Sequence, residues 1–134
     1  LEADTFDMVK LVAAGRTHQA LEKLNTLLAL QNDPILITGA LIANYLDVYR
    51  AFLAKKSRRP LADLAKDFGY SAKWNYRLGN ADQARARYDP RRIERSLQVL
   101  QALDLDLKGS RLPADLLLQK AVCELGLQTA GKSA

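Results

Sequence analysis

The segment from Pro34 to Lys56 is apolar on nearly all sides, and it limits the possible folds more than any other part of the chain. It reads PILITGALIANYLDVYRAFLAKK, and Asn44, Asp47 and Arg50 supply most of its polar side. As a helix it would be roughly 34 Å long, at about 1.5 Å per residue. A helix that is hydrophobic all round has to be covered by other elements. We therefore expect this segment to be the longest helix and the buried centre of the fold.

The rest of the chain carries helical patterns that can supply this cover. Apolar residues recur at helical spacing, and no segment alternates between apolar and polar residues over a useful length, so strands are not expected. The sequence predicts an all-α protein, a single compact bundle of six to seven helices over residues 1–126, followed by a frayed tail at 127–134. The amphipathic segments lie at about 4–14, 17–30, 60–68, 71–87, 90–109 and 113–125.

Local signals mark where several of these helices begin and end. Asp-Pro pairs at 33–34 and 89–90 place a capping carboxylate directly before a proline suited to the first helical position. Gly15 and Gly109 stand where helices are expected to end. Gly79 is expected to interrupt the helix that contains it, because glycine costs about 1 kcal/mol there relative to alanine.

Length and cysteine content narrow the class of protein. The chain has 134 residues, enough for one domain with a core, and we see no apolar run that predicts a membrane span. It opens on Leu1 without a signal peptide, which we interpret as a fragment of a longer protein. Cys123 is the single cysteine, so no internal disulfide forms, and a reducing cytoplasm is favoured. Its place beside an apolar stripe predicts an inert buried thiol.

Recognisable catalytic machinery is missing from the sequence. His18 is the single histidine and no second cysteine exists to build a zinc site. No phosphate-binding glycine loop is present, and Asp104 and Asp106 are two apart, so they point in different directions on a helix. Asp104 and Lys108 are spaced for a surface ion pair. We expect no catalytic residues, metal or cofactor, and no enzyme activity for this chain by itself.

Positive charge is concentrated in the middle of the chain. The net charge is +5, and residues 50–95 hold 13 basic and 5 acidic residues, against 7 and 10 in the remainder. Such a balance favours phosphate or an acidic partner, and the alternative is a solvated basic surface. The candidates for phosphate contact are Lys55, Lys56, Arg58, Arg59, Arg77, Arg85 and Arg87.

The stretch PLADLAKDFGYSAKWNYRL, residues 60–78, is typical of a helix-turn-helix. Gly69 is the expected turn and Ser71 the expected start of the second helix. In a DNA reader, Ala72, Lys73, Asn75 and Tyr76 would lie where base contacts are made. The same pattern also describes two helices folded onto a third, so a helix-turn-helix DNA-binding module remains the alternative hypothesis.

From Phe6 to Leu125, the order of local patterns resembles the C-terminal domain of the delta subunit of the bacterial DNA polymerase III clamp loader. The matching stretches are AAGRTHQALEKLNTLL, DPILITGALIANYLDVYRAFLAKK, LADLAKDFG and QARARYDPRRIERSLQVLQALDLDLKGS. The family usually has a proline after the third of these, where this chain has Ser71 and Ala72, and often a lysine pair where this chain has WNYR.

The resemblance implies a subunit-assembly domain that acts in clamp loading during DNA replication. In that family the C-terminal domains of the loader subunits form a helical collar, and delta itself is not an ATPase. The implied partners are the gamma/tau and delta-prime subunits, with the sliding clamp bound only by a part of the protein absent from this chain. We also expect that the basic middle of the chain can contact DNA. The expected location is the cytoplasm, and no contact with a membrane is expected.

Apolar side chains that lie off the main helical stripes are candidates for the subunit interface, because leftover apolar surface marks partner sites. They occur in the last two expected helices and the link between them. The candidates are Leu97, Val99, Leu105, Leu112 and Leu116.

Overall fold

The computed structural model describes residues 1–133, without the side chains of residue 2 and residues 128–133. The described residues form seven helices and no strand, which confirms the all-α prediction. The helices are α1 (Glu2–Ala13), α2 (Thr17–Ala29), α3 (Pro34–Ser57), α4 (Leu61–Asp67), α5 (Trp74–Arg85), α6 (Pro90–Gly109) and α7 (Ala114–Ser133).

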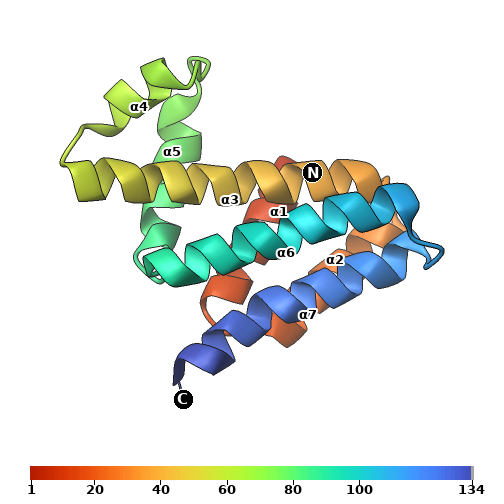
Figure 1. Cartoon of the computed structure of the whole chain (residues 1–134). Helices are drawn as coiled ribbons and strands as arrows, with labels where there is room; N and C mark the ends of the chain where they lie inside the picture. Colours follow the sequence, from red (N-terminus) through yellow and green to blue (C-terminus); the bar gives the residue numbers. More distant parts are fainter. Residues whose placement is uncertain (134) are drawn as a thin grey trace.

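Helix α3 runs through the middle of the bundle and packs against α1, α4, α5, α6 and α7 (Figure 1). At 24 residues it is the longest of the described helices. Tyr45 is 1% exposed and Phe52 is half-buried, as expected for a central helix. By length and composition α3 could also cross a membrane, but the core helix of a soluble protein passes the same test.

The other helices are arranged in pairs around α3 (Figure 1). Helices α1 and α2 pack together, as do α6 and α7, and α2 also contacts α7. The short α4 packs against α5 and against α3. The C-terminal end of α3 therefore lies beside α4 and α5, whereas the α6–α7 turn lies at the opposite end of the bundle (Figure 1).

The capping signals in the sequence act as predicted. The Asp33 carboxylate accepts a hydrogen bond from the Ile35 amide at 2.9 Å, and Asp89 accepts one from the Arg92 amide at 2.8 Å. Gly15 follows the C-cap of α1 in the turn to α2, with a φ of +80° in the left-handed region that glycine adopts readily.

Two expected boundaries differ from the observed ones. Gly79 does not interrupt α5, which continues through it to Arg85. The α5 helix begins at Trp74 rather than Ser71, because residues 72 and 73 form a turn. At the other end of the chain, α7 is helical through Ser133, and residue 134 lies outside the described residues. The fraying expected at 127–134 stays a prediction.

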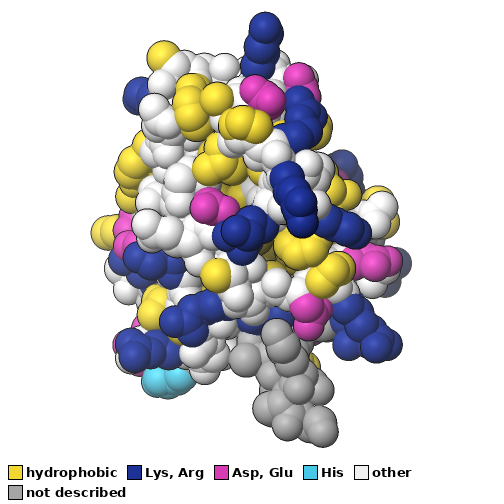
Figure 2. Space-filling view, turned by 90° about the vertical axis from the view of Figure 1, so that its left-hand side faces the viewer, with side chains coloured by type: hydrophobic (Ala, Val, Ile, Leu, Met, Phe, Trp, Pro, Cys, Tyr) yellow, Lys and Arg dark blue, Asp and Glu magenta, His cyan; other side chains and the backbone are white. Residues whose placement is uncertain are grey.

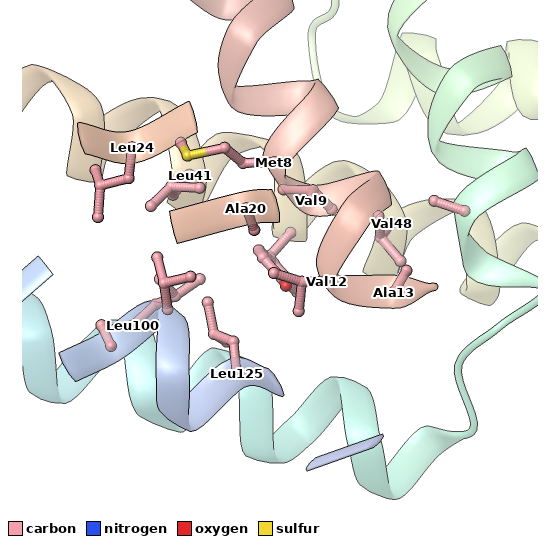
Figure 3. Packing of buried hydrophobic residues seen from close by; sticks show 14 of the residues in the cluster. Met8, Val9, Val12, Ala13, Ala20, Leu24, Leu41, Val48, Leu100 and Leu125 are labelled. Atoms are coloured by element: carbon pink, nitrogen blue, oxygen red, sulfur yellow. The ribbon is translucent and has the colours of Figure 1, made fainter. Parts of the chain in front are cut away.

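The core is one continuous cluster of side chains contributed by α1, α2, α3, α5, α6 and α7 (Figure 3). Its polar centre is a tyrosine pair. The Tyr88 hydroxyl donates to the Tyr45 oxygen at 3.2 Å, and the two rings meet edge to face. Burial raises the pKa of the Tyr45 hydroxyl well above its usual range, so this hydroxyl stays protonated inside the core.

Gly79→Ala is expected to stabilise the protein by about 0.5–1 kcal/mol, because alanine is the better helix former. A methyl group at this position meets no atom within 4 Å. The measurement is urea unfolding followed by circular dichroism. Gly69→Ala is the contrasting variant, since its φ of +70° disfavours any side chain and the change should cost about 1 kcal/mol. Stabilisation by both variants would contradict this account of the backbone.

Candidate interaction surfaces

Exposed cations surround the C-terminal end of α3. Lys55 and Lys56 lie in its last turn, and Arg58 follows as the C-cap residue with a left-handed φ of +55°. All three are exposed and form no ion pair with any described residue. Cations at a helix C-terminus are stabilised by the helix dipole, so this position is favourable for them without a partner. We call these three residues the basic exit of α3.

Two further arginines of the predicted phosphate set are engaged by carboxylates. Arg59 Nη2 lies 2.7 Å from Asp67 Oδ2 on α4, and Arg85 Nε lies 2.7 Å from Asp82 Oδ1 on α5. These pairs are partly exposed, so each contributes at most about 1 kcal/mol to stability. Their charge is partly neutralised, so these two arginines are less available to an external anion than the three cations of the basic exit.

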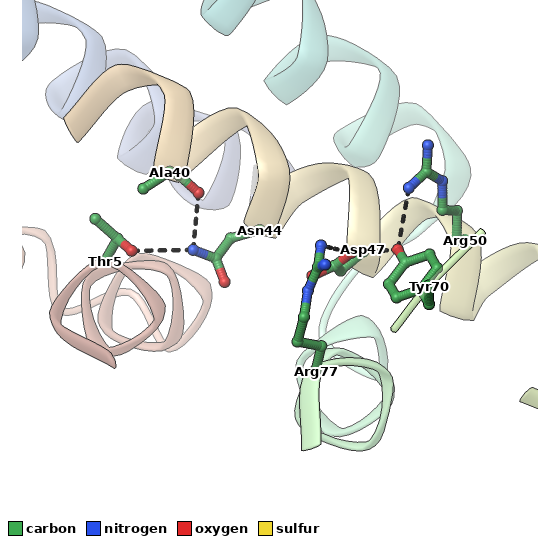
Figure 4. Close-up of polar contacts among 7 residues, drawn as sticks. All are labelled: Thr5, Ala40, Asn44, Asp47, Arg50, Tyr70 and Arg77. Carbon is green, nitrogen blue, oxygen red and sulfur yellow. Dashed lines mark hydrogen bonds and ion pairs between the residues drawn. The ribbon is translucent and has the colours of Figure 1, made fainter. Parts of the chain in front are cut away.

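Arg77 turns inward and pairs with a buried acid on α3 (Figure 4). The Asp47 carboxylate is 4% exposed and receives Arg77 Nη2 at 3.0 Å and Nε at 3.2 Å. The Tyr70 hydroxyl donates to the same carboxylate, and Arg50 Nη1 donates to the Tyr70 oxygen at 3.1 Å. Arg50 also stacks on Phe68, 4.3 Å from its ring centre.

This group, Asp47 with Tyr70, Arg77 and Arg50, fixes the α4–α5 turn against α3. The Tyr70 ring lies between two guanidinium groups, with the Arg77 carbon 4.6 Å and the Arg50 carbon 5.6 Å from its centre. Burial, followed by the hydrogen bond to Asp47, raises the pKa of the Tyr70 hydroxyl. The sequence interpretation took Arg77 for an outward-facing cation and placed Asp47 on the polar side of the long helix, whereas Asp47 is buried and paired. Tyr70 was not singled out. Tyr70 and Arg77 lie 23 and 30 residues from Asp47 in sequence, where no local pattern connects them.

Lysine and arginine side chains spread over the side of the molecule that α4, α5 and the end of α3 form (Figure 2). Hydrophobic side chains and a smaller number of acidic ones lie among them (Figure 2). Arg87, the last residue of the predicted phosphate set, is exposed just after α5 and lines a cleft with α1. This side is therefore basic, although three of the seven predicted cations are held by acids.

An apolar surface lies at the opposite end of the bundle, around the α6–α7 turn. Leu105, Leu112 and Leu116 are 62%, 52% and 48% exposed. The other two predicted interface residues, Leu97 and Val99, are half-buried and pack against the domain's own core. We call the three exposed leucines the leucine end.

The helix-turn-helix pair is only partly arranged as a DNA reader requires. Ala72 and Lys73 precede α5 instead of occupying its first turn, whereas Asn75 and Tyr76 are exposed at its start. Helix α5 packs across α3, and α4 packs against both (Figure 1). The pair thus serves as part of the bundle.

Some predicted features outside these surfaces can also be compared with the structure. Cys123 is exposed, so the prediction of a buried thiol was wrong; it lies beside the apolar stripe but points outward. His18 is exposed and pairs with Glu22. Asp104 and Lys108 form the expected surface pair at 3.0 Å. Among the described residues, no three His, Cys, Asp or Glu side chains come together as a metal site.

One buried arginine has a structural role that the sequence interpretation missed. Arg92 is 4% exposed and stacks 4.2 Å from the Tyr88 ring centre. Its guanidinium donates to the carbonyl oxygens of Val12 and Ala13 at 3.2 and 3.4 Å, at the end of α1. It thus satisfies carbonyl groups left open at a helix terminus. Nothing in the sequence distinguishes Arg92 from its exposed neighbour Arg91.

A family model for the C-terminal domain of the DNA polymerase III delta subunit matches residues 2–125. The chain belongs to this family. The fold agrees, because the structure is similar to that of the Bacillus subtilis DNA clamp loader delta protein (YqeN), with a TM-score of 0.85 at 14% sequence identity. That match covers 94% of this chain and 36% of the Bacillus protein. No curated protein matches the sequence.

The family establishes this chain as a delta-type C-terminal domain, a part of the polymerase III machinery. It confirms the resemblance from the sequence and the collar-like helical fold. Nothing in either comparison supports a helix-turn-helix DNA reader. The chain spans about a third of the length of the Bacillus delta protein, 36%, so the activity of a whole delta protein involves much that lies outside this domain.

Tyr70→Phe is expected to lower the free energy of unfolding by about 1.5 kcal/mol at neutral pH, because a buried carboxylate loses a donor. Since the folded pKa of Tyr70 is raised above the usual tyrosine value of about 10, this contribution is complete below about pH 10. It is lost as the pH rises through the folded pKa. Urea unfolding should show that the difference in unfolding free energy between Tyr70→Phe and the unaltered protein is smaller above about pH 10 than at pH 7.

Tyr76→Phe is the matched control, since Tyr76 is 63% exposed and its hydroxyl bonds no described residue. It should change stability little at either pH. A loss for Tyr70→Phe no larger than that of the control would show that the Asp47 hydrogen bond does not hold α4 and α5 in place.

Proposed function

We propose that this domain assembles a delta-type subunit with the other subunits of a clamp loader, gamma/tau and delta-prime, during DNA replication in the cytoplasm. The family match over residues 2–125 supports this function most directly. The structure adds a suitable surface, because the leucine end carries three large apolar side chains that the domain's own core does not cover. The role is assembly and not catalysis.

The leucine end has the composition of a contact with a permanent partner. Exposed apolar side chains gathered at one place on a soluble domain mark protein–protein contacts. Leu97 and Val99 lie earlier on α6 and pack against the domain's own core. We assign the direct contacts to Leu105, Leu112 and Leu116, and a supporting position to the other two.

Leu105→Asp and Leu116→Asp are each expected to weaken assembly about tenfold or more, because a charge is placed in a contact that excludes water. The measurement is co-purification and calorimetric titration with the other loader subunits. Leu127→Asp is the control, a 63% exposed leucine of α7 outside the leucine end. Circular dichroism verifies that each variant is folded. Unchanged assembly in both test variants would place the interface on another face.

A second proposal concerns nucleic acid: the basic exit contacts DNA phosphates without reading bases. Its three cations have no described acidic partner, and they stand at a helix end and a turn that cannot enter a groove in register. Arg87 extends the unpaired charge on this side, while Arg59, Arg77 and Arg85 are already engaged by carboxylates. Binding of this kind is sequence-independent.

Fluorescence anisotropy with two unrelated duplexes should show equal affinities that fall with salt, with a log–log slope of about −0.9 for each phosphate neutralised. Lys56→Glu and Arg58→Glu should weaken binding to both duplexes. Lys120→Glu on α7 should not. A preference above about tenfold for one duplex, lost in Asn75→Ala, would support base reading instead, and absence of binding at low salt would remove DNA from the function of this domain.

A further inference from the structure

Helices α1 and α5 leave a groove between them on one side of α3. Both pack across α3, but they make few contacts with each other, and Figure 4 shows them nearly end-on beneath it. Two hollows of about 610 and 430 Å³ lie along this line, and both are lined by Phe6 and Asn80. The two hollows therefore adjoin, and we call them together the α1–α5 groove; Tyr76, Asn80 and Gln83 border it on α5, and Arg87 borders it just after that helix.

One end of the α1–α5 groove is basic. Lys10, Arg16 and Arg87 line it from three different segments, and Arg16 and Arg87 form no ion pair with a described residue. The acid at this end, Asp7, is 3.3 Å from Lys23, which satisfies it locally. An anionic group entering here would meet several cations and no free carboxylate among the described lining residues.

The other end is apolar and has a floor of small residues. Ile35, Leu36 and Tyr76 are 65%, 60% and 63% exposed at its rim. Gly39 and Ala40 form part of the floor, and the position of a Cβ at Gly39 is open, with no atom within 4 Å. A side chain from a partner can thus approach the backbone of α3 closely while its apolar surface is covered by aliphatic groups.

Amide side chains lie between the two ends. Asn44 on α3 donates its amide hydrogens to Thr5 Oγ1 at 3.1 Å and to the Ala40 carbonyl at 2.9 Å (Figure 4). Its amide oxygen points into the space between α1 and α5 (Figure 4). Asn80 and Gln83 add two more amides from α5. Groups that both donate and accept suit the alternating donors and acceptors of a peptide backbone.

We propose that the α1–α5 groove binds an extended peptide segment of a partner protein, with acidic side chains at the Lys10–Arg16–Arg87 end and aliphatic side chains over Gly39 and Ala40. From Tyr76 to Arg87 the groove is roughly 16 Å long at about 1.5 Å per helical residue, which fits about five extended residues. This site is separate from the leucine end and does not depend on the assembly function.

Charge and surface chemistry favour this occupant over two others. A second copy of the chain carries a net charge of +5 and would bring like charge towards the basic end. A nucleic acid strand gains affinity by stacking successive bases on aromatic rings, whereas the rim exposes one ring, Tyr76, beside the two aliphatic side chains Ile35 and Leu36. An acidic–apolar peptide supplies both kinds of contact, because its carboxylates complement the basic end of the groove and its aliphatic side chains cover the apolar end.

The test uses fluorescent peptides that contain leucines and aspartates in either order, and matched peptides with lysine in place of aspartate. Anisotropy should show binding of an acidic peptide and not of the lysine peptides. Gly39→Leu fills the floor of the groove and should abolish binding. Gly79→Leu is its control, a helical glycine that also has open space but lines neither hollow.

The basic end is tested with Arg87→Glu, which should weaken acidic-peptide binding roughly fivefold and flatten its salt dependence. Arg95→Glu, an exposed arginine of α6 outside the groove, is the control. Ile35→Gln should weaken binding without changing the salt dependence, and Leu30→Gln, which is 71% exposed and outside the groove, should not.

Four results would overturn the proposal. The first is no binding of either acidic peptide, and the second is acidic-peptide binding that survives Gly39→Leu. The third is binding of an oligothymidylate to the unaltered protein that is lost in Gly39→Leu, which would assign the groove to nucleic acid. The last is self-association in sedimentation that Gly39→Leu removes, which would assign the groove to a second copy.

Discussion

The apolar sides of α3 have to be removed from water, and five of the other helices do this together. Each of them carries apolar side chains that it could not bury by itself, so the bundle forms around α3 as one unit. The direction of α3 then sets where everything else lies. Its C-terminal end carries the basic exit, and the pairing of α6 with α7 places the leucine end at the far side (Figure 1). Two surfaces of different chemistry are held apart by the length of one helix.

Burying α3 also buries the carboxylate of Asp47, and this has a structural cost that only specific partners offset. A buried charge without partners is strongly destabilising. Tyr70 and Arg77 come from the α4–α5 segment, so the carboxylate accepts its hydrogen bonds only when that segment is in place. This ion pair, buried on its Asp47 side and half-exposed on its Arg77 side, therefore specifies position more than it adds stability. Because Asp47 and Arg77 both line the α1–α5 groove, this pair also fixes one wall of it.

Much of the fold could be predicted because its signals are local. The carboxylates of Asp33 and Asp89 cap helices within three residues of themselves, and the apolar length of α3 predicts its burial directly. The functional surfaces were less predictable. Whether a cation such as Arg77 faces solvent depends on an acid 30 residues away, and the exposure of Cys123 depends on the angle at which α7 packs. The α1–α5 groove depends on two helices crossing a third, which no single segment encodes.

The short α4 packs against α3 and α5 and shares in no other large contact. Its link to α5 is followed directly by Trp74, the single tryptophan of the chain. The buried tyrosines, by contrast, lie at the centre of the core. The protein thus carries two natural optical reporters in different places. Tryptophan emission reports on the α4–α5 segment, while loss of the core adds the exposure of Tyr45 and Tyr88 to the tyrosine absorption. A tryptophan signal that changes first on heating would reveal a partly opened form.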